Sequence, residues 1–408
     1  MLGRVLNTHQ QWLCRQLADL GYVVSRQTAV PDTGPAIQGV VREALGRADL
    51  VIVTGGLGPT SDDLTRDLIA QLLNKKLLED AAVLEHITKF FTERKRPMPV
   101  RTRVQAMVPE GAMVLANPNG TAPGLAMEVS PNTFRPGAGP AWLVLLPGPP
   151  RELRPMFTET VIPLLRRVLP QPQEFVCRTL RTSGIGESLV EEKVGPLLEP
   201  LVAVGLELGY CARPGQVDVR LAARGGKAAK VVNEAEEVVR RALDKQVYTA
   251  DEEELESTVI RRMTELGKTL ALAESCTGGC LAHRLTNVPG ASAVLLAGWV
   301  TYSNAAKQKF LGVSAETLAA HGAVSEEVAK EMAEGARSAS GADYALSVTG
   351  IAGPGGGSPT KPVGTVFMAL AGAGPTVVLR QSNPWEREAF KQVTAQQAMN
   401  LLRRSLPE

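Results

Sequence analysis

Apolar positions in the first part of the chain recur at two different spacings. Leu13, Leu17 and Leu20 repeat at helical spacing and fall on one face of a predicted helix. Thr8 is the expected cap at the start of this helix, and Gly21 marks its end. Beyond this helix, short apolar runs of strand length alternate with further helical patterns.

The alternation extends over the first 170 residues. We expect extended segments at residues 22–30, 49–54 and 142–146, and helices at residues 36–48 and 155–169. Between them, residues 130–140 are rich in Pro, Gly and Ala and predict a flexible excursion. Alternating helices and strands favour a mainly parallel sheet with helices on both faces.

Two further units follow. A compositional break at residues 170–172 precedes a small α+β module with a strand, a helix starting near Glu187, two short extended runs and a charged helix. The last unit again alternates helices and strands and ends in a long helix. The fold class is therefore α/β, with domains expected at residues 1–170, 171–249 and 250–408, in agreement with the usual domain size.

Composition narrows the class of protein. Charged residues make up 21% of the 408 positions and the net charge is +2, which supplies no strong basic field for a nucleic acid. The five cysteines lack disulfide or zinc spacing, which is typical of thiols in a reducing compartment. No apolar run is long enough to span a bilayer, and no leader segment is evident. We expect a cytoplasmic protein that binds neither membranes nor nucleic acids.

Ser275 carries the sharpest chemical hypothesis. It lies between a strand-like stretch at residues 268–272 and a helix-like stretch at residues 280–285, where a hydroxyl can project from a sheet edge. The commoner role of such a serine is to cap the helix. The N–H groups around Thr277, Gly278 and Gly279 could stabilise an oxyanion or bind a phosphate, and sequence does not choose between them.

A serine hydroxyl needs a base to become a nucleophile. Lys307 can act as one only if burial or nearby charge lowers its pKa, because a lone lysine is usually a solvated surface charge. Tyr302 and Asn304 lie just before it, although such a tyrosine is more often a packing residue. Another glycine-rich loop, which contains Thr349, Gly350 and Gly353, also follows a predicted strand.

The first unit contains a second polar loop at a strand end. Its expected nucleotide-binding residues are Gly55, Gly56, Gly58 and Thr60, with Gly120 and Thr121 in a similarly placed turn. Asp62 and Asp63 could hold a divalent metal against a diphosphate. The alternative is structural, since Asp in a first helical turn often serves as a cap.

These motifs together resemble the CinA family over nearly the whole chain. The resemblance rests on residues 54–63, 120–124, 146–150, 273–279, 300–307, 321–327 and 349–354. It implies a doubly wound molybdopterin-binding-like domain associated with metal-dependent ADP-ribose pyrophosphatase activity, then a KH-like module. It further implies a C-terminal domain similar to nicotinamide mononucleotide deamidase, which releases ammonia and nicotinate mononucleotide. That domain would need no cofactor, whereas the first would take a divalent metal.

The resemblance also implies roles for single residues. Ser275 would be the nucleophile, Lys307 its base, and Tyr302 an orienting or proton-shuttling neighbour. The substrate would contact residues of four segments: Thr277, Gly278, Gly279, Asn304, Thr349, Gly350, Gly353, Arg387 and Lys391. An arginine often stands in the family where this chain has Lys391, and lysine lacks the bidentate fork of arginine.

Two further expectations follow from the resemblance. Family members have a strand and an acidic turn ahead of the segment that matches Leu2. If the protein starts at Met1, its N-terminal sheet would lack the first strand and its pyrophosphatase site would lack an acidic residue; the simpler alternative is a start further upstream. The chain is expected to form a homodimer and to act on small nucleotides. Two alternatives stay open beside amide hydrolysis, namely a main activity as an ADP-ribose pyrophosphatase and a non-enzymatic nucleotide-binding role linked to competence or DNA damage.

Overall fold

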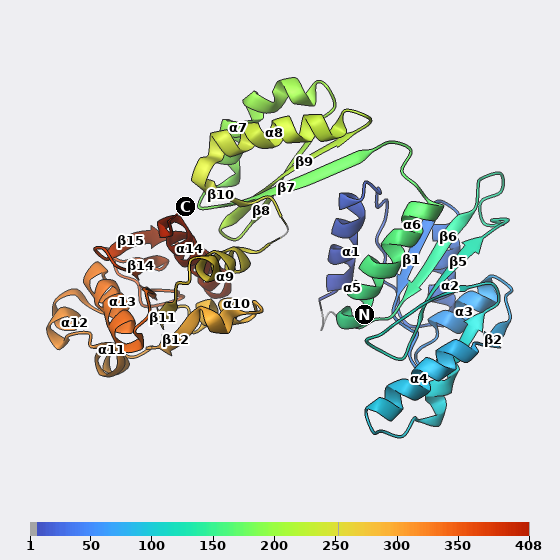
Figure 1. Cartoon of the computed structure of the whole chain (residues 1–408), viewed down its shortest axis with the longest axis horizontal. Helices are drawn as coiled ribbons and strands as arrows, with labels where there is room; N and C mark the ends of the chain where they lie inside the picture. The colour runs from blue at the N-terminus through green and yellow to red at the C-terminus, as the bar shows by residue number, and fades with distance from the viewer. Residues whose placement is uncertain (1–5, 252, 408) are drawn as a thin grey trace. The chain divides into compact units, whose positions relative to one another are not determined.

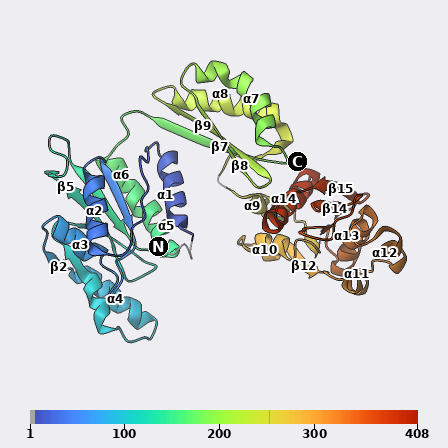
Figure 2. The ribbon, with the colours of Figure 1, turned by 180° about the vertical axis from the view of Figure 1, so that it is seen from behind.

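The computed structural model describes residues 6–251 and 253–407. The chain divides into two compact units, Met1–Pro172 and Gln173–Glu408. Figures 1 and 2 show their elements from opposite sides. Within the described residues, no helix combines the length and apolar character that a membrane crossing requires.

The first unit is built on a four-stranded sheet with the order β1-β6-β5-β4. Its strands are β1 (Leu50–Thr54), β4 (Met113–Leu115), β5 (Gly124–Val129) and β6 (Ala141–Leu146), and β2 (Leu77–Glu79) pairs separately with β3 (Met107–Pro109). Its helices are α1 (Thr8–Asp19), α2 (Gly34–Leu45), α3 (Thr65–Leu72), α4 (Ala81–Glu93), the 3-10 segment η1 (Val100–Ala106), α5 (Pro150–Met156), the π-helical η2 (Phe157–Val161) and α6 (Ile162–Val168).

Alternate side chains of β6 face opposite layers. Leu143 and Leu145 pack into the core formed with α2, α3 and α4, whereas Val144 and Leu146 pack against α1, α5 and α6 (Figure 1). Helices therefore cover both faces, as the pattern predicted. The expected strand directions were only partly right, because β1 runs parallel to β6 while β5 is antiparallel to both of its neighbours.

Three local predictions in this unit are corrected by the structure. Asn7, not Thr8, caps α1, because its side chain accepts a hydrogen bond from the Gln10 N–H at 3.2 Å. Residues 22–30 form no strand and are largely exposed. The closing helical segment begins at Pro150 rather than at residue 155. The predicted absence of a first strand concerns the chain before Leu6 and lies outside the described residues.

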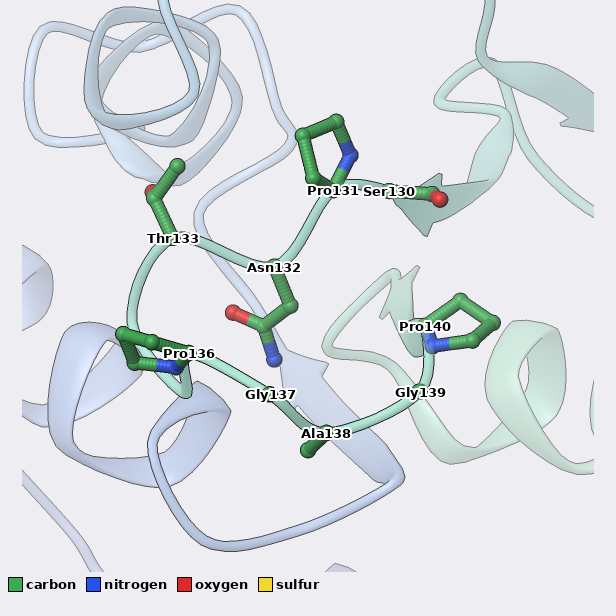
Figure 3. Close-up of a pocket in the computed structure, with 9 residues that line it drawn as sticks. All are labelled: Ser130, Pro131, Asn132, Thr133, Pro136, Gly137, Ala138, Gly139 and Pro140. Carbon is green, nitrogen blue, oxygen red and sulfur yellow. The ribbon is translucent and has the colours of Figure 1, made fainter.

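The flexible excursion at residues 130–140 curls around a cavity of about 500 Å³ that its own residues line (Figure 3). The Asn132 amide anchors the loop by donating to the Leu45 carbonyl at 2.9 Å. This loop joins β5 to the amino end of β6, so it lies at the sheet edge opposite the predicted loop after Thr54. The cavity is therefore separate from the predicted nucleotide site of this unit.

The second unit begins with the small α+β module. A fully antiparallel sheet of order β10-β7-β9-β8 packs against two helices. Its elements are β7 (Phe175–Ser183), α7 (Glu187–Val202), β8 (Glu207–Arg213), β9 (Gln216–Arg224), α8 (Ala228–Leu243), the 3-10 turn η3 (Asp244–Gln246) and β10 (Val247–Thr249). The sequence predicted the first strand, the helix near Glu187, the two extended runs and the charged helix that corresponds to α8, but neither the short strand β10 nor the antiparallel order of the sheet.

The rest of the second unit is a five-stranded sheet of order β12-β11-β13-β14-β15. Its strands are β11 (Leu270–Glu274), β12 (Leu295–Val300), β13 (Tyr344–Gly350), β14 (Thr365–Ala371) and β15 (Val377–Ser382). The helices are α9 (Leu255–Glu265), α10 (Cys280–Thr286), the 3-10 turn η4 (Ala291–Ala293), α11 (Asn304–Leu311), α12 (Ala315–His321), α13 (Glu326–Ser340) and α14 (Arg387–Ser405).

The interior strand β11, second in this sheet, is buried on both faces. Leu270 and Leu272 pack with α9, α10 and α14, whereas Ala271 and Ala273 pack against α11 and α13 on the other side (Figure 1). Because β11 runs parallel to β12 and β13, the carboxyl ends of these three strands lie at one edge of the sheet. The predicted polar loops of this domain therefore meet at that edge.

Candidate active site

Ser275 and Lys307 meet at the carboxyl end of β11. Lys307 Nζ lies 3.0 Å from Ser275 Oγ and donates to the Thr301 carbonyl at 2.7 Å. Ser275 lies in the turn after β11 and Lys307 lies on α11, 32 positions further along the chain. The predicted nucleophile and base are therefore in hydrogen-bond contact.

Lys307 is buried, with 1% of its surface exposed. Within the described residues, no carboxylate forms an ion pair with its ammonium group. Burial lowers the pKa of Lys307 from its ordinary value, against a smaller opposing effect from Cys276. A lysine that loses its proton more easily than usual has a lone pair with which to accept the proton of Ser275.

The alternation of β11 explains why the two side chains meet. Ser275 continues the strand by one position, since its N–H donates to the Val348 carbonyl at 2.9 Å. It shares the parity of Ala271 and Ala273 and therefore faces the layer of α11. Ser303 caps α11 by accepting from the Ala306 N–H at 3.1 Å, which places Lys307 in the first turns of that helix.

Two glycines shape the turn that follows Ser275. Gly278 and Gly279 have φ values of +61° and +95°, a region that favours glycine. Their N–H groups already have acceptors, because Gly278 donates to the Ser275 carbonyl at 3.1 Å and Gly279 donates to the Glu274 carboxylate at 3.0 Å. The turn N–H groups of Cys276 and Thr277 donate to no backbone carbonyl among the described residues and meet only the Cys276 sulfur, a weak acceptor, so they are better placed to meet an oxyanion.

The neighbouring thiol is a poor rival to the serine. Cys276 is 6% exposed, and burial raises its pKa to about 12. A thiol with this pKa carries almost no thiolate near neutral pH, and the thiolate is the reactive form. Ser275, which retains 9% exposure, is the stronger candidate nucleophile.

Arg387 joins three of the predicted site segments. It donates to the Tyr302 hydroxyl and to the Gly353 carbonyl, both at 2.7 Å. Tyr302 itself is 62% exposed. Its hydroxyl is thus held by the arginine, a contact that suits the orienting role that the resemblance implied.

The other predicted substrate contacts vary in their surroundings. The Thr349 hydroxyl is buried and donates to the Ala323 carbonyl at 2.7 Å. A side chain at Gly350 would approach the Thr365 carbonyl to 2.8 Å, so close strand packing already accounts for that glycine. Asn304 is exposed, and Lys391 Nζ lies 3.9 Å from a Glu388 carboxylate oxygen.

The predicted loop of the first unit is held together by its own polar groups. Asp63 accepts from the Thr60 N–H at 3.0 Å and from the Thr60 hydroxyl at 2.6 Å, and Asp62 also accepts from that hydroxyl. The hydrogen bond from Thr60 lowers the pKa of Asp62. A side chain at Gly58 would approach the Asp63 carboxylate to 2.3 Å. These contacts match the structural alternative, in which the aspartates stabilise a turn.

Asp62 and Asp63 are not joined by further metal-ligating side chains in the part of the chain that the structure describes. Within the described residues, no group of three or more His, Cys, Asp or Glu side chains is arranged to hold a metal ion. Gly55 and Gly56 have φ values of +90° and +68°, so the tight turn itself requires them. A divalent metal at Asp62 and Asp63 remains a prediction.

The turn that contains Gly120 and Thr121 is also tightly packed. A side chain at Gly120 would approach the Glu152 carboxylate to 2.1 Å. Glu152 is buried and accepts from the Asn117 amide at 2.9 Å, while the Gly120 carbonyl contacts the His86 ring nitrogen at 3.0 Å. Packing against Glu152 therefore accounts for Gly120 without a ligand.

Sequence reasoning missed Glu274. Its side chain is 1% exposed and accepts from three backbone N–H groups at the start of α10. The available signal was a carboxylate as the last residue of a fully buried strand, where an unpaired charge is unfavourable. Such a residue must find several donors, and the nearest are the free N–H groups of the next helix.

Three known families match consecutive parts of the chain. The family described as a probable molybdopterin binding domain matches residues 1–167, and the damage-inducible protein CinA KH domain matches residues 177–249. The CinA C-terminal domain matches residues 252–406. The three matches follow the order that the resemblance predicted.

Individual relatives are similar over the full length. A putative competence-damage inducible protein of Moorella thermoacetica is 44% identical, over 100% of this chain and 96% of its own length. A CinA-like protein of Akkermansia muciniphila is 45% identical, over 98% of this chain and 93% of its own. Among solved structures, the competence/damage inducible protein CihA of Agrobacterium tumefaciens is 44% identical over 37% of this chain and 92% of its own, with a TM-score of 0.35.

Proposed function

Because the chain belongs to the CinA family, we propose that its C-terminal domain hydrolyses the carboxamide of nicotinamide mononucleotide. The products are nicotinate mononucleotide and ammonia. The observation that carries this proposal is the 3.0 Å contact between Ser275 Oγ and the buried amine of Lys307. It provides a nucleophile and a base suited to amide hydrolysis without a thiol.

The first chemical step is acylation of Ser275. The neutral amine of Lys307 accepts the hydroxyl proton as Ser275 Oγ attacks the carboxamide carbon, and the amide oxygen becomes an oxyanion. The N–H groups of Cys276 and Thr277, which otherwise meet only the weakly accepting Cys276 sulfur, are the donors that we assign to that oxygen. Lys307 then returns the proton to the nitrogen, the C–N bond breaks, and ammonia leaves.

The second step hydrolyses the ester. Lys307, neutral again, accepts a proton from water as the water oxygen attacks the ester carbon. The C–O bond to Ser275 breaks, the serine oxygen takes back the proton from Lys307, and the nicotinate carboxyl group is released. The Thr301 carbonyl holds Lys307 Nζ in place through both steps, because its 2.7 Å hydrogen bond needs only one N–H of the amine.

The charge around the site suits an anionic nucleotide. Arg387 and Lys391 lie one turn apart on the first part of α14 and supply two positive charges for the substrate phosphate. Arg387 also fixes the loops that contain Tyr302 and Gly353. The guanidinium group of Arg387 would therefore both bind the substrate phosphate and hold these two loops in place.

The proposal is tested by offering the purified protein two substrates separately. Nicotinamide mononucleotide should give equal amounts of ammonia and nicotinate mononucleotide, at the same rate with and without a metal chelator. ADP-ribose supplied in parallel tests the first domain, where chelator-sensitive formation of AMP would indicate a separate metal-dependent activity. No ammonia from nicotinamide mononucleotide under either condition would contradict the proposal.

A further inference from the structure

Glu274 is the last residue of β11 and directly precedes Ser275. Its carboxylate accepts from the N–H groups of Gly279 at 3.0 Å, Leu281 at 3.1 Å and Ala282 at 2.8 Å. With 1% exposure, it is a buried anion whose two oxygens are both occupied by backbone donors. Such charge-assisted hydrogen bonds are among the stronger ones in proteins.

Strand parity directs the two neighbouring side chains to opposite layers. Glu274 shares the parity of Leu270 and Leu272, which face α10, whereas Ser275 shares that of Ala273, which faces α11. The carboxylate therefore reaches α10 from one face of the sheet. The hydroxyl reaches Lys307 from the other face.

The Glu274 carboxylate links the two ends of the turn that contains Ser275. The residue before Ser275 is bonded to the residues after the turn, so the segment from Ser275 to Gly279 is closed into a loop at both ends. A second tie comes from the backbone of the same residue, since the Glu274 carbonyl accepts from the Thr301 N–H at 2.9 Å. Thr301 in turn holds Lys307, so Glu274 contacts both segments that carry the reacting groups.

We propose that Glu274 is a positioning residue, which holds the Ser275 turn in its reactive conformation and takes no part in proton transfer. The inference rests on the proposed amide hydrolysis for its kinetic consequence, but its structural consequence stands alone. The turn contains two glycines with left-handed φ values, so without the bridge its backbone has many alternative conformations. Loss of alignment by about 1 Å is enough to reduce catalysis by roughly 100-fold.

The carboxylate also satisfies the positive end of α10. Three of the N–H groups that a helix start leaves unpaired are bound to Glu274, whereas the turn N–H groups of Cys276 and Thr277 meet only the weakly accepting Cys276 sulfur among the described residues. A substrate oxygen would therefore find its donors in the serine turn, because the donors at the start of α10 are already bound to Glu274. This arrangement agrees with a carboxamide as the reacting group.

The test is the isosteric change Glu274→Gln. A glutamine keeps the shape but turns an NH₂ group towards backbone donors, so at least one hydrogen bond is replaced by a donor–donor contact. We expect kcat for ammonia release to fall about 10- to 100-fold, with KM within about threefold of the wild-type value. The acid limb of the pH profile should keep its position, since Lys307 sets it.

Asp343→Asn is the matched control. Asp343 caps the opposite end of the same strand by accepting from the Thr269 N–H at 2.9 Å, and it pairs with Lys268 at 2.9 Å. It is a carboxylate with comparable local bonding but no contact with the serine turn. We expect this variant to lose some thermal stability and to keep kcat within about twofold of wild type.

A readout independent of activity uses the thiol inside the turn. Cys276 is 6% exposed, so iodoacetamide should modify it slowly in the wild-type protein, as followed by fragment-ion mass spectrometry that distinguishes it from Cys280 on the same peptide. Loosening the turn in Glu274→Gln should increase that rate about tenfold or more, while Asp343→Asn leaves it unchanged. This result is meaningful even if nicotinamide mononucleotide is not the substrate.

A second variant guards against misfolding of the first. Ala282→Pro removes one of the three donors, 2.8 Å from the carboxylate, at a first-turn position that tolerates proline, and leaves the charge intact. It should show the same two effects at smaller size. Wild-type kcat and Cys276 protection in both variants would overturn the proposal, as would a shifted acid limb in Glu274→Gln. Faster Cys276 modification without any wild-type deamidation would instead refute only the proposed function.

Discussion

The glycine-rich turns after β1 and after β11 look alike in sequence and differ in structure. Each follows the carboxyl end of a parallel strand and contains polar side chains. After β1, Thr60 bonds with both Asp62 and Asp63, so the polar groups satisfy one another. After β11, Ser275 contacts a buried lysine that has no carboxylate partner within the described structure.

The difference shows what separates a structural turn from a reactive one. A turn whose polar groups pair with one another is stabilised by these contacts without a ligand. A buried amine without a counter-charge is unfavourable for folding, and natural proteins retain such groups mainly where function requires them. Burial of Lys307, rather than the glycine pattern, is therefore the observation that makes the second turn the stronger candidate for an active site.

The largest effect expected from this comparison is that of Ser275→Ala. Loss of the nucleophile should reduce ammonia release from nicotinamide mononucleotide by at least about 1,000-fold. The thermal unfolding midpoint should change little, because the backbone hydrogen bonds of the turn and its contact with the Glu274 carboxylate do not involve the serine hydroxyl. Thr60→Ala removes the corresponding hydroxyl of the first turn and should keep the full rate. Equal rates for wild type and Ser275→Ala would remove the serine from the mechanism.

A smaller effect is expected for Tyr302→Phe. The change deletes a hydroxyl that binds Arg387 at 2.7 Å, in a side chain that is 62% exposed. A hydrogen bond to a charged group at such an exposed site contributes about 1 kcal/mol, which corresponds to roughly a fivefold loss of kcat/KM. Steady-state kinetics would measure it. A loss above about 100-fold would instead indicate a direct role of the phenol in proton transfer.

The smallest effect on activity is expected in the first turn. Asp63→Ala removes the two hydrogen bonds to Thr60 and should lower the free energy of unfolding of that unit by about 1 kcal/mol. Ammonia release should stay within about twofold of wild type. Thermal denaturation and the deamidation assay together measure both quantities. A large loss of deamidation would mean that the two turns are functionally coupled.

The layers of the fold could be predicted because they depend on local periodicity. Leu270 and Leu272 alternate with Ala271 and Ala273, and this alternation alone indicates a strand buried on both faces. Strand direction was less accessible, since β5 and β14 each pair antiparallel with a strand next to them in the chain, and the long loops between these strands carry no sequence signal for a tight hairpin. The extended prediction for residues 22–30 failed because apolar residues there have no partner strand among the described residues.

The site was predictable in its residue types but not in its bonding. Ser275, Lys307, Tyr302 and Arg387 do lie at one edge of the sheet, as parallel strands require. A carboxylate at the end of a buried strand signals that Glu274 needs several donors, but which N–H groups it meets depends on the turn that leads into α10. The same limit applied to Asp62 and Asp63, whose partner proved to be Thr60 two and three residues earlier.

The central claim is that Lys307 is neutral when it activates Ser275, and the pH dependence of ammonia release tests this most directly. Burial lowers the pKa of Lys307 below the ordinary 10.5, so kcat/KM should rise with pH as one group loses its proton and should level off below 10.5. Lys307→Arg keeps a cation of similar length that does not lose its proton, and it should lose both this rise and at least about 100-fold in rate. A rise that persists unchanged in Lys307→Arg, or one that begins only above 10.5, would contradict the account.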